Sequence, residues 1–115
     1  MSKAVSIKIR FYNYDVVAIG PGKADLLEAV QQYGSISAAG RAMGMSYKRA
    51  WDLVNAMNSS FNKPLVETIK GGAHGGGAVV TTFGQSVLGL YRQIEQKSAK
   101  SVEHDLAAIS KLLKP

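Results

Sequence analysis

The stretch from Ser35 to Phe61 constrains the fold of this chain most strongly, because it has the pattern of two helices joined by a tight turn. Ser37 precedes a short apolar segment as an N-cap, so a helix is predicted over residues 38–43. Gly44 follows at a position where helices often end in a left-handed conformation. Ser46 is a second N-cap, for a longer helix that ends near Phe61. The stretch therefore predicts a helix-turn-helix.

Apolar residues recur at helical spacing in this stretch, which indicates that its helices share a core. In the second helix these residues are Ala50, Leu53, Val54, Met57 and Phe61. Gly40 interrupts the first helix, at a cost of about 1 kcal/mol relative to alanine. Such a cost is expected where another segment of backbone passes close by, as it does when two short helices cross.

The first turns of the second helix carry residue types that suit contact with nucleic acid. A DNA recognition helix contacts base edges with its N-terminal residues, and Lys or Arg there binds guanine edges or phosphates. The candidate contact residues are Ser46, Tyr47, Lys48, Arg49, Trp51 and Asn55. The alternative interpretation is a solvated helix surface with Trp51 in the core. The arrangement as a whole favours DNA contact.

Composition agrees with one small domain that has an anionic partner. The chain has 115 residues, 46% of them hydrophobic, and a formal net charge of +6. A basic balance favours a polyanion such as double-stranded DNA. The absence of cysteine excludes disulfides, iron–sulfur clusters and thiolate zinc sites. The first residues lack the apolar core of a signal peptide, and no run approaches the roughly 20 apolar residues of a membrane span, so we expect a cytoplasmic protein that does not enter a membrane.

The segment before the helix-turn-helix predicts two strands and a supporting helix. Residues 5–12 alternate between apolar and polar side chains, which is typical of a half-buried strand. The apolar run from Val16 to Ile19 can form a second strand that pairs with it. A helix is predicted from Lys23 to Tyr33 and ends at Gly34. This helix would complete a three-helix core.

A glycine-rich loop between two short strands follows the helix-turn-helix, as in the wing of a winged helix. The strands are predicted at residues 65–70 and 78–80, with seven residues between them. The loop also contains a Gly-x-x-Gly-x-Gly string, but a dinucleotide site needs a helix that opens at the glycines. A Val-Val strand follows instead, so the wing interpretation is favoured. Lys70 and His74 would be its polar contacts with a DNA backbone, unless the loop contacts nothing.

Hydroxyl residues near predicted helix starts complete the candidate DNA-contact set. Ser35 and Ser37 would meet phosphates at the start of the first helix of the helix-turn-helix. Thr81 follows the wing and is the predicted N-cap of the next helix, and we include it in the set.

A long C-terminal helix is predicted after Thr81. The rest of this small domain is too short to cover the full length of that helix. About 30 residues at 1.5 Å per residue span roughly 45 Å. Its apolar residues at helical spacing are Val87, Leu90, Tyr91, Ile94, Leu106, Ile109 and Leu113. We therefore predict that this helix forms a homodimer. The alternative is two helices that break near residues 98–101 and fold back on their own chain.

Together these elements predict a mainly α-helical fold with small β elements. A winged helix-turn-helix with a three-helix core, a β-hairpin wing and an N-terminal strand would occupy residues 1–82, and a dimerisation helix residues 83–115, within one domain. His74 and His104 are thirty residues apart, and no catalytic or metal-binding motif is evident. We therefore expect a protein that is not an enzyme and holds no cofactor.

Seven short motifs along the chain are distinctive. They are Leu-Leu-Glu-Ala at 26–29, Gly-Ser-Ile-Ser at 34–37, Gly-Met-Ser-Tyr-Lys-Arg-Ala-Trp-Asp at 44–52, Ala-Met-Asn at 56–58, Pro-Leu-Val-Glu at 64–67, Gly-Gly-Ala-His-Gly-Gly-Gly-Ala at 71–78 and Thr-Thr-Phe-Gly-Gln at 81–85. They resemble the N-terminal, LysR-type winged helix-turn-helix domain of the ModE family of molybdate-responsive transcription regulators. The resemblance covers about residues 5–95.

The resemblance implies a dimeric regulator of molybdenum-related genes that reads a palindromic operator. The recognition-helix positions of the family fall on Ser46 to Arg49 and Trp51, and the wing on residues 70–77. Full-length members also carry C-terminal molybdate-binding domains, whereas this chain stops at Pro115. We therefore expect no molybdate binding by that route, and either regulation without the ligand or a separate partner that senses the effector.

A second interpretation differs in function class. A winged helix of this kind can instead dock another protein, or bind DNA without sequence preference as an architectural factor.

Overall fold

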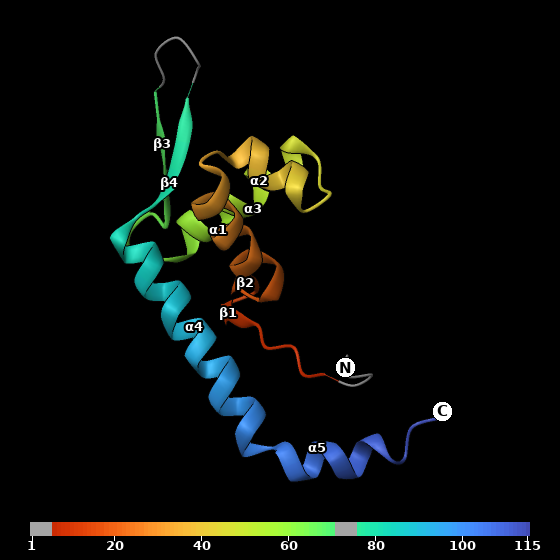
Figure 1. The fold of residues 1–115 in the computed structure, drawn as a ribbon. Coiled ribbons are helices and arrows are strands. Elements are labelled where there is room, and N and C mark those ends of the chain that lie inside the picture. The colour runs from red at the N-terminus through yellow and green to blue at the C-terminus, as the bar shows by residue number, and fades with distance from the viewer. Residues whose placement is uncertain (1–5, 71–75) are drawn as a thin grey trace.

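Three helices and two β-hairpins form the head of the computed structural model, which describes residues 6–70 and 76–115. The helices α1 (Pro21–Tyr33), α2 (Ile36–Ala42) and α3 (Tyr47–Ser60) follow one another directly along the chain. From the head, α4 (Thr82–Ser101) extends as an arm that ends in α5 (Glu103–Ser110) (Figure 1). The predicted mainly α-helical fold with a winged helix-turn-helix is confirmed.

The turn between α2 and α3 has the predicted geometry. Gly44 has a φ of +71°, in the left-handed region that favours glycine. The Oγ of Ser46 accepts a hydrogen bond from the backbone N–H of Arg49 at 3.0 Å, so Ser46 is the N-cap of α3. At Gly40 an added Cβ would lie 3.0 Å from the Cβ of Ala50. The nearest neighbour is thus a side chain of α3, with the backbone oxygen of Met45 farther off at 3.7 Å, and the small residue lets α2 and α3 cross closely.

The start of α2 differs from the prediction that Ser37 is its N-cap. The Oγ of Ser35 accepts a hydrogen bond from the backbone N–H of Ala38 at 3.0 Å, so Ser35 is the cap and the helix begins at Ile36. Ser37 lies inside the helix, where its Oγ accepts a hydrogen bond from Nη1 of Arg41 at 2.9 Å. The chain offers two serines with one residue between them, and the earlier one has the extended backbone that a cap requires.

The N-terminal hairpin is shorter than predicted. It pairs β1 (Phe11–Asn13) with β2 (Val16–Ile19) in antiparallel register. Residues 6–10 are not part of a strand, so the strand predicted over residues 5–12 was wrong in extent; its first residue lies outside the described residues. The pairing stops where Phe11 meets Ile19, because the chain turns into α1 immediately after Ile19 and leaves earlier residues without a partner strand.

The second hairpin is the predicted wing. It pairs β3 (Val66–Ile69) with β4 (Gly77–Val80) in antiparallel register, and the connecting residues 71–75 lie outside the described residues. The backbone N–H of Ala78 donates a hydrogen bond to the carbonyl oxygen of Gly34 at 2.9 Å. This bond attaches the wing to the turn between α1 and α2, so the wing stands beside the helix-turn-helix.

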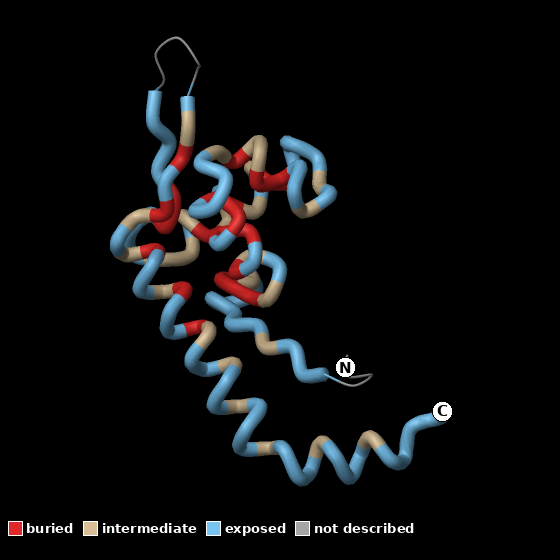
Figure 2. The backbone as a smooth tube through the Cα atoms, viewed as in Figure 1, coloured by how far each residue is buried: buried red, intermediate tan, exposed pale blue. Residues whose placement is uncertain are grey.

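The apolar core lies where the three helices meet the base of the wing and the first half of α4 (Figure 2). Its largest fully buried side chains are Leu26, Leu27, Val30, Val54, Met57, Leu65 and Tyr91. They come from α1, α3, the start of the wing and α4, so the core fixes the wing and the root of the arm relative to the helix-turn-helix.

The C-terminal arm consists of two helices, so the break that the sequence left as an alternative is present. Val102 separates α4 from α5 with φ −113° and ψ 14°, next to the residues where the alternative placed a break. No residue of α5 is buried, so this fully described helix does not fold back onto the head as the alternative also proposed (Figure 2). Among the helices of residues 6–70 and 76–115, none combines the length and the hydropathy of a membrane-spanning segment.

Candidate nucleic-acid interface

The outward surface of α3 carries a polar stripe. Lys48, Asp52 and Asn55 are four and three residues apart and therefore share one side of the helix, and all three are exposed. The ammonium of Lys48 forms an ion pair with a carboxylate oxygen of Asp52 at 2.9 Å, with the two side chains 84% and 56% exposed. An exposed pair of this kind contributes little to stability. Lys48 can therefore leave Asp52 for a phosphate or a guanine edge at small cost.

Arg49 lies within electrostatic reach of α1. Burial, and secondly the positive charge of Arg49, lower the pKa of Lys23. The Nζ of Lys23 donates a hydrogen bond to the carbonyl oxygen of Val17, which ties α1 to the N-terminal hairpin. The two adjacent cations of α3 thus have different neighbours. Lys48 lies beside Asp52 on the exposed stripe, and Arg49 lies toward Lys23 at the start of α1.

Tyr47 and Trp51 form an aromatic pair one helical turn apart on α3. Their rings are 6.1 Å apart between centroids at an interplanar angle of 73°, an edge-to-face arrangement. Tyr47 is 60% exposed, whereas Trp51 is partly buried and packs against the core. The Nε1 of Trp51 is buried and has no hydrogen-bond partner among the described residues. Trp51 therefore supports Tyr47 from the core side.

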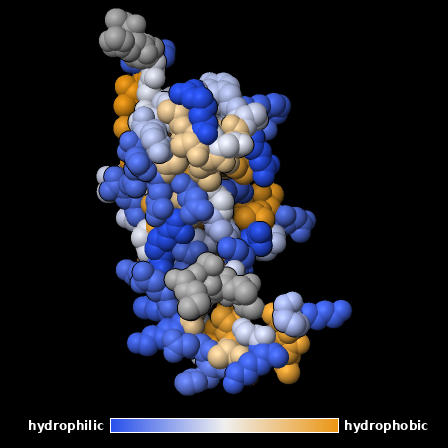
Figure 3. Space-filling view, turned by 45° about the vertical axis from the view of Figure 1, so that its right-hand side comes forward, coloured by the Kyte–Doolittle hydropathy of each residue, from blue (hydrophilic) through white to orange (hydrophobic). Residues whose placement is uncertain are grey.

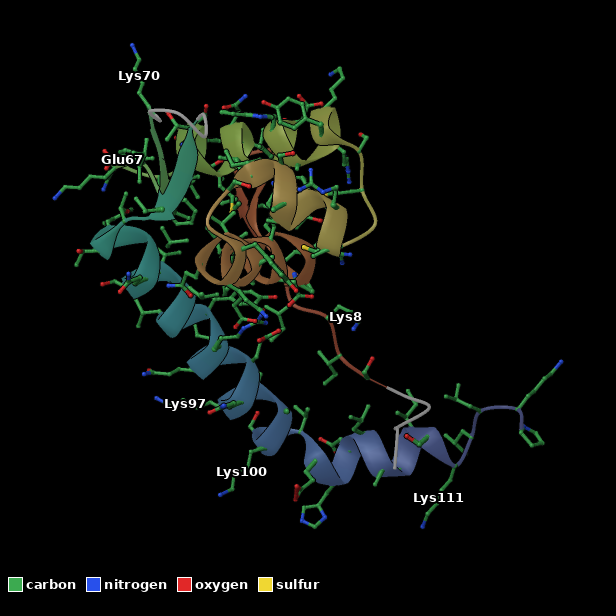
Figure 4. The ribbon with its side chains drawn as sticks, turned by 45° about the horizontal axis from the view of Figure 1, so that its top comes forward. Lys8, Glu67, Lys70, Lys97, Lys100 and Lys111 are labelled. Atoms are coloured by element: carbon green, nitrogen blue, oxygen red, sulfur yellow. The ribbon has the colours of Figure 1, made fainter. Side chains whose placement is uncertain are left out.

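A groove runs between α3, the start of α2 and the wing. Its lining residues are Ser35, Ile36, Ser37, Tyr47, Trp51, Thr68, Ile69, Lys70, Gly76, Gly77 and Ala78. The fold thus brings together five of the predicted contact residues from separate parts of the chain. Lys70, just after β3, points outward from the wing (Figure 4). His74 lies outside the described residues.

The hydroxyl residues of the predicted contact set differ in whether their hydroxyl proton is available to donate a hydrogen bond to a phosphate. Ser35 and Ser46 accept hydrogen bonds as N-caps, and each keeps its hydroxyl proton for donation. The Oγ1 of Thr81 accepts from the N–H of Gly84 at 2.9 Å and also donates to the carbonyl oxygen of Pro64 at 2.8 Å. Thr81 lies outside the groove with its donor in use. It caps α4, as the sequence predicted, and a phosphate contact at Thr81 would have to replace its hydrogen bond to Pro64.

Two neighbours of the predicted contact residues were missed in the sequence. Asp52 forms an ion pair with Lys48, and its position four residues after Lys48 was the available signal. Arg41 is exposed on α2 and donates to Ser37, also at a spacing of four residues. The groove residue Thr68 carried no signal, because its place depends on the packing of the wing.

The residues predicted for dimerisation divide between the core and the surface. Tyr91 is 1% exposed, and its hydroxyl donates a hydrogen bond to the carbonyl oxygen of Ile9 at 2.7 Å. Burial, and secondly the charge of Glu95, raise the pKa of Tyr91. Tyr91 thus belongs to the core of its own chain, which corrects its assignment. Val87 packs against the same core, and Leu106 is half-buried. Leu90, Ile94, Ile109 and Leu113 are exposed.

Comparison with protein families identifies this arrangement. A family model described as bacterial regulatory helix-turn-helix protein, lysR family, matches residues 23–85. The chain belongs to this family. The match runs from α1 to the first turn of α4, so it contains the helix-turn-helix, the wing and the groove between them.

The relatives of this lysR-family chain include molybdenum-related proteins. MopB of Rhodobacter capsulatus, a molybdenum-pterin-binding protein, is 46% identical over 82 residues, which cover 71% of this chain and 30% of MopB. ModE of Escherichia coli K12, a DNA-binding transcriptional dual regulator, is 41% identical over 102 residues, with coverage of 79% and 39%. The chain thus spans about a third of the length of these curated relatives. The predicted resemblance to ModE is confirmed.

Solved structures agree on the fold. The CbnR_DBD–DNA complex matches with a TM-score of 0.58 at 22% identity, over 76% of this chain and 95% of that chain. ArgP of Mycobacterium tuberculosis matches with a TM-score of 0.52 at 18% identity, over 72% of this chain and 29% of that one. At these identities the matches show a shared winged helix-turn-helix fold.

Proposed function

We propose that this chain is a sequence-specific, DNA-binding transcription regulator of the ModE type, which acts in the cytoplasm as a homodimer on a palindromic operator. The observation that carries the proposal is the position of α3 beside the wing, with predicted contact residues from both lining one groove. The family match and the printed function of E. coli ModE support DNA as the partner. The molybdenum-related names of MopB and of the Azotobacter vinelandii protein ModE support control of molybdenum-related genes.

In this proposal α3 enters the major groove with its N-terminal turns. Lys48 and Asn55 lie on the exposed stripe and suit guanine and adenine edges respectively. Tyr47, which lines the protein groove between α3 and the wing, contacts the sugar–phosphate backbone. Lys70 contacts phosphates beside the wing. The formal net charge of +6 supplies long-range attraction to the duplex.

The homodimer is supported by two apolar surfaces that the described part of one chain leaves uncovered. One is a groove between the N-terminal hairpin, the end of α3 and α4; its apolar lining includes Phe11, Ile19, Phe61, Leu90 and Ile94. The other is α5, where apolar side chains gather at the surface of the lower end of the molecule (Figure 3).

A second copy is the proposed occupant of both surfaces. An eight-residue helix is too short to be stable alone in water. The arm also carries α5 away from the apolar groove of its own head (Figure 1). A two-fold dimer covers α5 and the groove in both copies at once, since each patch recurs on each protomer.

The experiment that tests the proposal is selection of bound duplexes from a random pool at physiological salt. The expected result is a two-fold symmetric motif whose half-sites lie about one helical turn apart. Recovery of unselected sequence would show binding without sequence preference, as expected for an architectural factor. Recovery of no DNA at all would favour a module that docks protein. Either of these outcomes would contradict the proposal.

A further inference from the structure

Arg92 holds the arm to the head through three carboxylates from two helices. Its guanidinium contacts Asp25 at 2.7 Å and Glu28 at 3.0 Å, both on α1, and Glu95 at 2.9 Å on α4 itself. Each of the three guanidinium nitrogens donates to a different residue. A single exposed pair would contribute little, but a network centred on one arginine that is only 28% exposed holds a defined geometry.

The network stands at the point where α4 leaves the head. The buried residues of α4 are Gly84, Leu88 and Tyr91, and every later residue of this fully described helix lies outside the core. Arg92 directly follows the last of them. Burial opposes the charge of Arg92, but hydrogen bonds with Glu28, Asp25 and Glu95 outweigh it and raise the pKa of Arg92 above its ordinary value. The contact between α1 and α4 is therefore ionic over the whole pH range in which the carboxylates are charged.

We propose that Arg92 is a positioning residue that fixes the direction in which the arm leaves the head, and so sets the half-site spacing that the dimer accepts. This inference rests on the proposed function, because spacing has meaning only for a dimer that reads two half-sites. Asp25 and Glu28 belong to α1, which packs directly against α2. The network thus connects the helix-turn-helix to the arm without touching DNA.

The length of the arm converts a small angular change into a large displacement. From Arg92 to the end of α4 the helix extends about 14 Å at 1.5 Å per residue. A rotation of about 15° at Arg92 would move that end by roughly 3.6 Å, close to the 3.4 Å rise of one base pair per strand. Loosening the network therefore lets one dimer accept spacings that differ by a base pair.

The test uses Arg92→Met, which removes the charge and the donors while keeping a flexible side chain of similar reach. The matched control is Lys97→Met, the same change of charge on the arm, since Lys97 is exposed and points away from the head (Figure 4). A second lesion, Asp25→Asn with Glu28→Gln, breaks the network from α1 and leaves Arg92 in place. Affinities are measured for duplexes that carry the selected half-sites at the selected spacing and at one base pair more or less, and for a single half-site.

The wild-type chain and Lys97→Met are expected to lose about tenfold or more in affinity when one base pair is added, because spacing is fixed by the dimer geometry. Arg92→Met and the double variant are expected to lose less than about threefold, with affinity for the single half-site within about twofold of wild type. A purely structural role would lower affinity equally at all spacings.

Two results would overturn the inference, and they differ in what else they affect. If Arg92→Met and the double variant both keep the wild-type spacing profile, Arg92 does not set spacing and the proposed function stands. If the wild-type chain itself has no spacing preference, the proposed dimeric regulator fails and this inference fails with it.

Discussion

At the scale of single residues, the candidate interface depends on which donors are free to leave their partners in the unbound protein. Lys48 holds only an exposed carboxylate, and Ser35 and Ser46 keep a hydroxyl proton after capping their helices. Thr81 has already used its proton on Pro64. The same hydroxyl chemistry therefore gives two candidate phosphate contacts and one structural cap.

Lys48→Ala is expected to weaken binding to the selected operator by about 1–3 kcal/mol if Lys48 reads a base edge. Titration of the variant against the operator measures the effect. Arg49→Ala tests its neighbour in the same way. Unchanged affinity in both variants would show that the first turn of α3 is not the recognition surface.

Asp52→Asn is expected to strengthen DNA binding, whereas Lys48→Ala is expected to weaken it. The change releases Lys48 from its ion pair and removes a negative charge from the helix surface that we propose to contact DNA, so affinity for any duplex should rise. The gain should appear on random-sequence DNA as well as on the operator, because it is electrostatic. Glu67→Gln is the control at an exposed carboxylate of the wing. A fall in affinity for Asp52→Asn would mean that Asp52 itself contacts a base.

At the scale of elements, local sequence signals were sufficient to predict the helix-turn-helix. They were not sufficient to predict the extent of the strand before it. A serine cap and a left-handed glycine act within a few residues, so Ser46 predicted the start of α3 and Gly44 the end of the preceding helix. The alternation over residues 5–12 contains no information on where a partner strand ends. It therefore predicted too long a strand.

The helical spacing of apolar residues also does not show which side of α4 packs against the rest of the same protomer. Tyr91 has the same spacing as Leu90 and Ile94, yet only Tyr91 is buried, because the N-terminal hairpin packs against that side of α4. The contacts of Arg92 with α1 join residues 64 and 67 positions apart, so no local pattern predicted them.

Gly40→Val is expected to destabilise the fold by about 1–3 kcal/mol, because added atoms would overlap Ala50 of α3. Thermal or denaturant unfolding measures this change. The matched control is Gly89→Ala in α4, where an added Cβ meets no atom within 4 Å. That variant should gain about 0.5–1 kcal/mol through helix propensity. Equal stability of Gly40→Val and wild type would contradict the tight crossing of α2 and α3.

At the scale of the whole molecule, the head that carries the candidate nucleic-acid interface is joined to an arm, and the end of that arm has no core of its own. The described residues extend 56 Å along the longest axis, and α5 contributes no buried residue to the head. Such a shape is expected when a second copy completes the structure, and in the proposed dimer the contact on α5 would lie far from the candidate nucleic-acid interface.

Ile109→Glu is expected to convert the proposed dimer to a monomer without unfolding the head. Ile109 is 53% exposed on α5 in the single chain, so the substitution buries no charge in the monomer but places one in the dimer contact. Sedimentation or light scattering measures the mass, and unfolding of the head is the control. An unchanged dimer mass would place the contact elsewhere.

The central claim is that this lysR-family chain distinguishes one DNA sequence from others. Its most direct test is the ratio of equilibrium dissociation constants for a random-sequence duplex and for the selected operator, measured side by side at physiological salt. The account predicts a ratio of about 10³ or more, as for other sequence-specific proteins. A ratio near one would contradict it.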